Sequence, residues 1–315
     1  MKTPGSTNPA QVANPRADPG ALARAIAAFT MAQGRRGVQA VALEVAERDG
    51  RPVVAGTVLT QRQAREVRDL ARQYGVTAEL VVAADPRSGM EGGWVVPVGA
   101  LLDVWREPAR SGTEMGRQTQ YLAADGPLRR FGEDAGFVLV QGPDLAMGWA
   151  ASADLRVAGI DAETHPWAHV ARAQENVARN PALAGAGLEQ VLGRAREELG
   201  VAYVWGGTTH AGFDCSGLLQ RVFRDSTGVL LPRHTGDQRH VGARVVAGGV
   251  RAGDLVFAAP RAQKVGHVLL MTSASTVLHA CRTENRVIEE SLVDNALRYQ
   301  HQGWRRPVWL GGVPE

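Results

Sequence analysis

At positions 203–217 the chain reads YVWGGTTHAGFDCSG, where an apolar run breaks and a helix is predicted to begin near Cys215. Cys215 is one of only two cysteines in the 315 residues. A helix N-terminus presents unpaired N–H groups and the positive end of the helix dipole, and both stabilise a thiolate. Because the thiolate is the attacking form of cysteine, we expect a lowered pKa for the Cys215 thiol and a role for it as a nucleophile.

A cysteine nucleophile needs a proton acceptor within reach, and two histidines downstream are candidates. His267 lies in the apolar run GHVLLM at 266–271, and His279 lies twelve positions later in the run VLHAC at 277–281. Short apolar runs of this kind are typical of buried strands. The sequence therefore supplies a cysteine on a predicted helix, a base on one predicted strand and an orienting group on the next.

Six short motifs, in this order, resemble the motif set of the NlpC/P60 cysteine peptidases. They are Tyr203-Val204-Trp205-Gly206-Gly207, Gly212-Phe213-Asp214-Cys215-Ser216-Gly217, Leu231-Pro232-Arg233, Gly253-Asp254-Leu255-Val256-Phe257, Gly266-His267-Val268 and His279-Ala280. The resemblance covers about residues 186–312 and implies a papain-like α+β fold in which Cys215 on a helix faces His267 and His279 on a sheet. It also implies hydrolysis of a bond to γ-D-glutamate in the peptides of peptidoglycan.

The resemblance gives each of three residues a role. Cys215 would attack the carbonyl carbon, and His267 would take the thiol proton and later protonate the leaving amine. His279 would hold the His267 ring in the useful tautomer. The second cysteine, Cys281, lies two residues past His279 on an apolar predicted strand, so we expect it to be structural.

Four further residues match positions at which the family binds substrate. The hydroxyl of Tyr203 is expected near the nucleophile, where it would help to bind the oxyanion beside N–H groups at the helix start. Asp214, Ser216 and Thr235 are expected to line the substrate groove. Trp205, in contrast, is expected to be a core aromatic residue.

Recycling members of the family recognise a free N-terminal amine through acidic and tyrosine side chains, and this chain departs from that pattern. Arg233-His234 stands where those enzymes carry Arg-Asp, and Ala146-Met147 replaces the tyrosine expected before Gly148-Trp149. Glu114 and Asp237 are the carboxylates that could take the place of the missing aspartate. Removing a buried charge partner of an ammonium group costs about 2–5 kcal/mol of binding, which is enough to change specificity.

The resemblance favours the peptide L-Ala-γ-D-Glu-diamino acid as substrate, cut between γ-D-Glu and the diamino acid. Two other interpretations stay open. A related amidase or acyltransferase could use the same cysteine and histidines on an amide or ester outside peptidoglycan. A non-catalytic wall-binding protein would rest on the SH3-like region described below, but a protein that only binds needs none of Cys215, His267 and His279.

The sequence predicts no metal site, no cofactor and no nucleic-acid partner. Six possible metal ligands crowd one stretch, but no pair of them has the spacing of a structural zinc site; they are His210, Asp214, Cys215, His234, Asp237 and His240. No glycine-rich phosphate loop is present in the sequence. The net charge is only +3, and 32 acidic residues balance the 35 Lys and Arg residues, which leaves no basic block for nucleic acid.

The start of the chain bears on its location. Residues 1–20 contain four prolines and no apolar stretch of secretory length, so we expect a disordered or extended N-terminus and no signal peptide. Two cysteines, one of them needed free, fit a reducing compartment, and the sequence therefore predicts a cytoplasmic protein. A secreted chain that had lost its leader would begin in the same way. No later apolar run has the length of a membrane span.

Residues 21–95 have the pattern of a small α+β domain. Periodicity predicts its elements in the order helix, strand, strand, helix, strand, at 21–33, 38–47, 53–59, 60–74 and 78–84. This order resembles that of BON-like domains.

Residues 96–158 change to short predicted strands separated by Gly, Pro and Asp, at 102–105, 128–131, 137–140 and 148–150. This region resembles a bacterial SH3 domain, and any other small β-barrel is the alternative. A linker at 159–185 then leads to a helix at 187–200, which begins the catalytic domain at 186–315. The predicted fold class of the whole chain is α+β.

Overall fold

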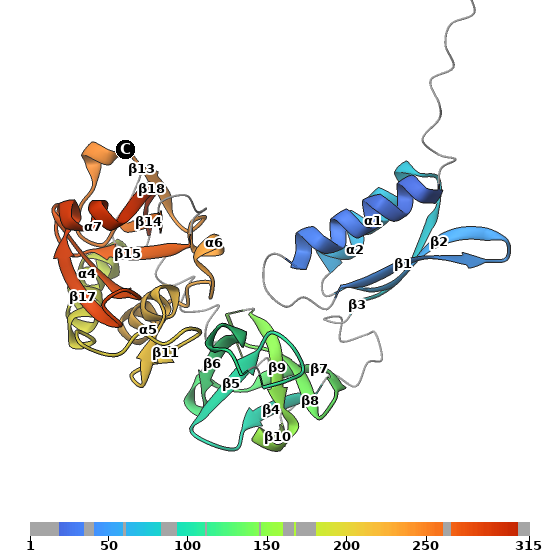
Figure 1. Cartoon of the computed structure of the whole chain (residues 1–315), viewed down its shortest axis with the longest axis horizontal. Helices are drawn as coiled ribbons and strands as arrows, with labels where there is room; N and C mark the ends of the chain where they lie inside the picture. The colour runs from blue at the N-terminus through green and yellow to red at the C-terminus, as the bar shows by residue number, and fades with distance from the viewer. Residues whose placement is uncertain are drawn as a thin grey trace, which may run out of the picture. The chain divides into compact units, whose positions relative to one another are not determined.

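The computed structural model describes residues 19–34, 41–58, 61–82, 93–110, 112–144, 146–159, 167, 181–260 and 266–307. The chain divides into two compact units, one formed by Met1–Arg35 with Gln39–Met90 and the other by Arg36–Val38 with Glu91–Glu315 (Figure 1). The expected segment at residues 1–20 lies almost wholly outside the described residues. The domain boundaries expected from the sequence stay predictions.

The first unit has two helices and a three-stranded sheet. Its elements are α1 (Pro19–Gly34), β1 (Ala42–Arg48), β2 (Arg51–Val58), α2 (Gln61–Gln73) and β3 (Thr77–Val82). Strands β1 and β2 are antiparallel, whereas β2 and β3 are parallel and joined through α2. Asp49 and Gly50 form the tight β1–β2 turn, both with positive φ, as a two-residue hairpin turn requires.

The predicted element order of this unit is confirmed, with shifts of a few residues at the ends. Leu22 and Ile26 of α1 pack with Val54 of β2 and Val67 of α2 in one buried cluster. Both helices therefore pack on the sheet around a single core. The resemblance to BON-like domains stays a prediction.

A seven-stranded antiparallel sheet opens the second unit. Its strands are β4 (Trp94–Pro97), β5 (Leu101–Trp105), β6 (Arg117–Leu122), β7 (Leu128–Asp134), β8 (Phe137–Gln141), β9 (Met147–Ala151) and β10 (Leu155–Ala158). They pair in the order β10-β4-β7-β8-β9-β5-β6, which leaves β6 at one end of the sheet. Single turns of 3₁₀ helix lie at Glu114–Gly116, Ala123–Asp125 and Ser152–Asp154.

The four predicted strands of this region correspond to β5, β7, β8 and β9, whereas β4, β6 and β10 were not predicted. Val104, Leu128 and Val140 form the centre of a buried cluster on this sheet. Gly148 is required by close packing, since a Cβ there would lie 2.5 Å from Val104 Cγ1 and 2.6 Å from the carbonyl oxygen of Trp105.

The rest of the second unit is a mixed arrangement of helices on a six-stranded antiparallel sheet. The sheet order is β13-β18-β14-β15-β16-β17. Its strands are β13 (Ala243–Val245), β14 (Leu255–Pro260), β15 (His267–Met271), β16 (Thr276–Cys281), β17 (Arg286–Ser291) and β18 (Tyr299–Arg306). The other elements are α4 (Pro181–Glu197), α5 (Cys215–Thr227), α6 (Thr235–Gln238), α7 (Leu292–Arg298), the hairpin β11 (Thr208–Thr209) and β12 (Gly212–Phe213), and a 3₁₀ turn at Ala247–Gly249.

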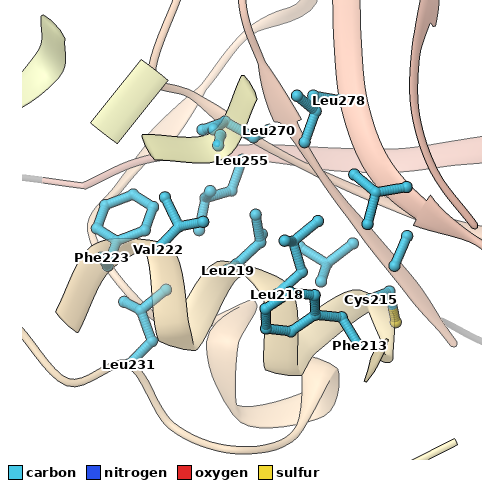
Figure 2. Packing of buried hydrophobic residues seen from close by; sticks show 14 of the residues in the cluster. Phe213, Cys215, Leu218, Leu219, Val222, Phe223, Leu231, Leu255, Leu270 and Leu278 are labelled. Carbon is cyan, nitrogen blue, oxygen red and sulfur yellow. The ribbon is translucent and has the colours of Figure 1, made fainter. Parts of the chain in front are cut away.

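Helix α5 is the element that holds this core together. Figure 2 shows Leu218, Leu219 and Val222 of α5 pointing toward Leu255 of β14, Leu270 of β15 and Leu278 of β16, and all six are buried in one cluster with Cys215. Full burial of each such side chain contributes about 1.5–3 kcal/mol. The apolar face of α5 therefore fixes the N-terminus of the helix against the strands that carry the two histidines.

The ends of α5 follow from its sequence. Asp214 is its N-cap, and the Asp214 carboxylate accepts a hydrogen bond of 2.7 Å from the N–H of Gly217. At the other end Gly228 takes a left-handed conformation, φ +72°, and closes the helix through an N–H bond to the carbonyl of Arg224.

Helix α4 differs from its prediction. The sequence placed a linker up to residue 185 and a helix at 187–200, whereas α4 spans Pro181–Glu197. Proline is well suited to the first turn of a helix, because its missing N–H has no partner to lose there. The helix ends before Gly200, whose φ of +85° suits glycine. No helix in the described ranges is long and apolar enough to cross a membrane.

Candidate active site

The Cys215 side chain lies at the first residue of α5 and is 6% exposed. Its Sγ atom is 3.7 Å from Thr235 Oγ1 and 3.8 Å from the carbonyl oxygen of Gly266, and the N–H of Val268 also faces it. Gly266 and Val268 flank His267, so the sulfur lies beside β15 at that histidine. The contacts of Sγ in the described chain do not include a hydrogen bond to the His267 ring; such bonds tighten in substrate complexes.

The two histidines contact each other directly. His267 Nε2 and His279 Nδ1 are 2.7 Å apart, on the neighbouring strands β15 and β16. The His267 ring is stacked on the ring of Tyr299, with centroids 4.6 Å apart and an angle of 13° between planes. His267 is therefore held on one face by an aromatic ring and at Nε2 by His279.

Glu290 completes this chain of contacts and was not predicted from the sequence. His279 Nε2 is 2.9 Å from Glu290 Oε1, and the same oxygen accepts a bond of 2.8 Å from Asn295 Nδ2. Arg298 forms an ion pair with Glu290 Oε2. A glutamate in β17 carries no motif of its own in the sequence, and only the pairing of β16 with β17 brings it to His279.

The pKa of Cys215 contradicts the sequence-based expectation. Burial, followed by the charge of the nearby Asp214 carboxylate, raises the pKa of the Cys215 thiol to about 11, against smaller opposite effects of Thr235, Val268 and Arg233. The expected lowering was wrong because the helix N-terminus that favours a thiolate is itself buried and capped by an anion. The thiol is protonated at neutral pH, so an attack by the sulfur would require this proton to leave.

Both histidines are neutral at neutral pH. Burial, with a further contribution from His279, lowers the pKa of His267 well below its usual value. Burial, followed by the charge of Arg298, lowers the pKa of His279 to about 3. A neutral ring on His267 has a free lone pair, so this residue can accept a proton from a thiol.

Arg233 binds the side chains at the start of α5. Its guanidinium, 2% exposed, donates to both carboxylate oxygens of Asp214 at 3.0 and 2.6 Å, to Ser216 Oγ at 2.9 Å and, through Nε, to Thr119 Oγ1 at 2.8 Å. The polar atoms of Asp214 and Ser216 are therefore engaged inside the protein, whereas Thr235 faces the sulfur. Substrate contacts by Asp214 and Ser216 stay predictions. The Leu231-Pro232-Arg233 motif includes Arg233, but it did not predict these hydrogen bonds to Asp214 and Ser216.

Tyr203 and Trp205 lie in the loop before the β11–β12 hairpin. Tyr203 is buried in the same cluster as Cys215, and its N–H donates to the carbonyl of Asn285 at 2.9 Å. The proposed use of its hydroxyl on an oxyanion stays a prediction. Trp205 is half-buried, with the Arg282 guanidinium 5.6 Å from its ring centroid.

Strand β6 of the seven-stranded sheet borders this region along its length. Arg117 Nη1 donates to the carbonyl of Trp205 at 3.3 Å, and the carbonyl of Gln120 accepts a bond of 2.9 Å from Thr208 Oγ1. Between them, Gln118 Nε2 lies 2.7 Å from His234 Nε2. The free edge of the sheet is thus covered by the loops that surround Cys215.

Three residues bear on the recognition of a substrate amine: His234, Asp237 and Glu114. Burial, with the charge of Arg233, lowers the pKa of His234 to about 4, so the pair of His234 and Gln118 is uncharged at neutral pH. Asp237 is half-exposed on α6. The Glu114 side chain lies outside the described residues. Within the described ranges no three His, Cys, Asp or Glu side chains are grouped to hold a metal ion.

Residues 200–306 match the model of the NlpC/P60 family, and this part of the chain is an NlpC/P60 family domain. The chain is 34% identical over 124 residues to a gamma-DL-glutamyl hydrolase and 39% identical over 87 residues to a gamma-D-glutamyl-L-lysine dipeptidyl-peptidase, both from Bacillus subtilis. These matches cover 39% and 27% of this chain, and 29% of each relative. The chain therefore aligns with less than a third of the length of either relative.

A solved structure of an NlpC/P60 family protein from Bacillus cereus aligns with 84% of this chain and 78% of its own, at 19% identity and a TM-score of 0.35.

Proposed function

We propose that the protein is a cysteine endopeptidase that hydrolyses the bond between γ-D-glutamate and a diamino acid in peptides derived from peptidoglycan. The observation that carries the proposal is the position of Cys215 Sγ beside β15 at His267, with His279 bound to the far nitrogen of that histidine. The NlpC/P60 match and the names of the two γ-glutamyl relatives support the substrate class. The proposed fold of this domain is papain-like, and the proposed reaction needs no cofactor.

The proposed reaction has two stages. As Sγ of Cys215 bonds to the γ-carbonyl carbon, the thiol proton passes to His267; the C–N bond then breaks and His267 gives that proton to the leaving amine. A water molecule, deprotonated by His267, hydrolyses the thioester and restores the thiol. The N–H groups of the first turn of α5, with the Tyr203 hydroxyl, are proposed to bind the oxyanion.

We further propose that the seven-stranded sheet is a bacterial SH3-like domain that forms one wall of the substrate site. The contacts from β6 to Trp205, Thr208 and His234 support this placement. The pair of Gln118 and His234 is uncharged, so it offers no charge to attract a free N-terminal amine of the substrate. We therefore expect a peptide with an acylated amine to be favoured at least as much as one with a free amine. The pattern of two free cysteines supports a cytoplasmic location.

Two other functions follow from specific observations. One relative is named only as a gamma-DL-glutamyl hydrolase, without reference to peptidoglycan, so a γ-glutamyl bond in another kind of substrate is the second candidate. A wall-binding protein without activity would use the seven-stranded sheet alone, and the geometry around Cys215 would then serve no purpose.

The test is mass-spectrometric analysis of products from L-Ala-γ-D-Glu-diaminopimelate, from its N-acetylated form and from poly-γ-glutamate, using wild type and Cys215→Ala. We expect cleavage of both peptides after γ-D-Glu by wild type and none by Cys215→Ala. Cleavage of the free-amine peptide alone would mean that a carboxylate such as Asp237 or Glu114 binds the amine. Cleavage of poly-γ-glutamate alone, or of nothing, would overturn the proposed substrate.

A further inference from the structure

His279, the second histidine of the candidate site, contacts the carboxylate of Glu290, which has three polar partners. Glu290 Oε1 accepts from Asn295 Nδ2 at 2.8 Å and lies 2.9 Å from His279 Nε2, while Arg298 pairs with Oε2. Asn295 is fully buried and its amide oxygen is 2.8 Å from His301 Nε2, which turns the amide nitrogen toward Glu290. Every neighbour of this carboxylate can therefore act as a donor.

The protonation of the two rings follows from this arrangement. An ionised carboxylate only accepts hydrogen bonds, so His279 must donate from Nε2. A neutral imidazole carries one N–H, so Nδ1 of His279 is left as an acceptor, and its partner 2.7 Å away, Nε2 of His267, must donate. The lone pair of His267 is then on Nδ1, the ring nitrogen that does not contact His279.

We propose that Glu290 is a positioning residue that selects these tautomers, so that His267 presents a basic Nδ1 to Cys215. This proposal rests on the proposed function for its effect on turnover, but the tautomers themselves require no substrate. Glu290 acts through His279 and touches neither the thiol nor the reacting carbonyl.

The substitution Glu290→Gln shows why a carboxylate is needed at this position to set the histidine tautomers. A glutamine at position 290 has the same shape but one oxygen and one NH₂ group. The guanidinium of Arg298 is charged and favours the oxygen on its own side, which turns the NH₂ toward His279. The amide of Asn295 must then turn over, so that its oxygen accepts from this NH₂ and its nitrogen faces His301. His279 Nε2 would then accept, its proton would move to Nδ1, and His267 would carry its proton on Nδ1, the nitrogen needed as base.

The kinetic test compares Glu290→Gln with Glu289→Gln. Glu289 is the preceding residue of β17 and faces the opposite side, where its carboxylate is 3.6 Å from Arg196, so it is a matched control. We expect Glu290→Gln to lower kcat on the γ-D-Glu peptide on the order of 10²-fold with little change in KM, and Glu289→Gln to stay within twofold of wild type. Glu290→Asp, which is shorter but only accepts, is expected to lose less activity than the isosteric glutamine.

A second measurement separates this proposal from the proposed function. Two-bond ¹H–¹⁵N spectra of protein labelled in the histidine rings report which nitrogen is protonated, with His267 and His279 assigned by substitution. We expect Nε2–H on both rings in wild type and Nδ1–H on both in Glu290→Gln. If wild type cuts no peptide, the proposed function fails while these spectra still decide the role of Glu290. Unchanged tautomers in Glu290→Gln, or a kcat equal to that of Glu289→Gln, would overturn the role.

Discussion

At the scale of single residues, Cys215 is subject to two opposing effects. A helix N-terminus favours an adjacent anion by about 0.3–1 kcal/mol at exposed sites, which is less than one pKa unit. Burial shifts a pKa by up to about 3–5 units in the other direction, and Asp214 adds to it. Burial therefore wins, and the resting pair is a thiol with a neutral imidazole. In the proposed reaction, the proton moves only when a substrate carbonyl accepts the sulfur.

This resting state predicts how alkylation of Cys215 depends on pH. With a pKa near 11, the thiolate fraction rises tenfold per pH unit, so the rate of reaction with iodoacetamide is expected to climb steadily from pH 7 to 10. The rate would be followed by mass spectrometry in a Cys281→Ala background, which removes the only other thiol. A rate that is already constant at pH 7 would instead indicate a preformed thiolate–imidazolium pair.

At the scale of elements, the start of α5 depends on a close approach between two backbones. A Cβ at Gly217 would lie 2.0 Å from the carbonyl oxygen of Gly207 and 3.1 Å from Asp214 Oδ1. The same oxygen of Gly207 accepts the N–H of Asp214 at 3.0 Å, so the loop before the hairpin cannot move away without losing that bond. The glycine lets the loop rest on the first turn of the helix.

A pair of glycine-to-alanine substitutions tests this contact. Gly217→Ala is expected to lower the free energy of unfolding by about 1–3 kcal/mol through overpacking and to reduce activity, because the N-cap shifts with the loop. Gly193→Ala, at an exposed position inside α4 with nothing within 4 Å of the new Cβ, is expected to raise it by about 0.4–1 kcal/mol. Urea unfolding of both variants decides, and equal effects would refute the close approach as the cause.

How far the sequence predicts these elements depends on the signal each one carries. Apolar periodicity and the NlpC/P60 motifs located the strands of His267 and His279 and the helix of Cys215, since those patterns are local. Glu290 and the role of Arg233 were missed, because both act through partners that are distant in sequence and meet only by strand pairing and burial. Strand β6 was missed as well, since its polar residues Gln118 and Gln120 lack the apolar alternation of a half-buried strand.

At the scale of the whole second unit, a buried ion pair joins the seven-stranded sheet to α5. Asp125, 3% exposed, accepts bonds of 3.0 and 2.9 Å from the two terminal nitrogens of Arg221, and Arg224 Nη1 is 2.6 Å from Asp125 Oδ1. Because both arginines lie on α5, these contacts tie the sheet to α5 at this point. Gln220 of α5 adds a bond of 3.0 Å to Asp144.

Removal of Asp125 is expected to weaken the whole second unit. Asp125→Ala leaves the charge of Arg221 buried without its partner, which costs about 3–5 kcal/mol of unfolding free energy. Asp154→Ala removes the partner of Arg110 in an exposed pair and is expected to cost less than about 1 kcal/mol. Circular dichroism in urea measures both. A loss at Asp125 as small as that at Asp154 would mean that the sheet and α5 are not coupled through this pair.

The central claim is that Cys215 attacks the γ-glutamyl carbonyl, and the most direct measurement is a search for the thioester. Wild type and Cys281→Ala would be mixed with L-Ala-γ-D-Glu-diaminopimelate, quenched in acid within the first turnover and mapped by tandem mass spectrometry. We predict an L-Ala-γ-D-Glu acyl group on Cys215 in both proteins and no adduct or cleavage in Cys215→Ala. Cleavage that survives in Cys215→Ala, or an acyl group on another residue, would contradict the account.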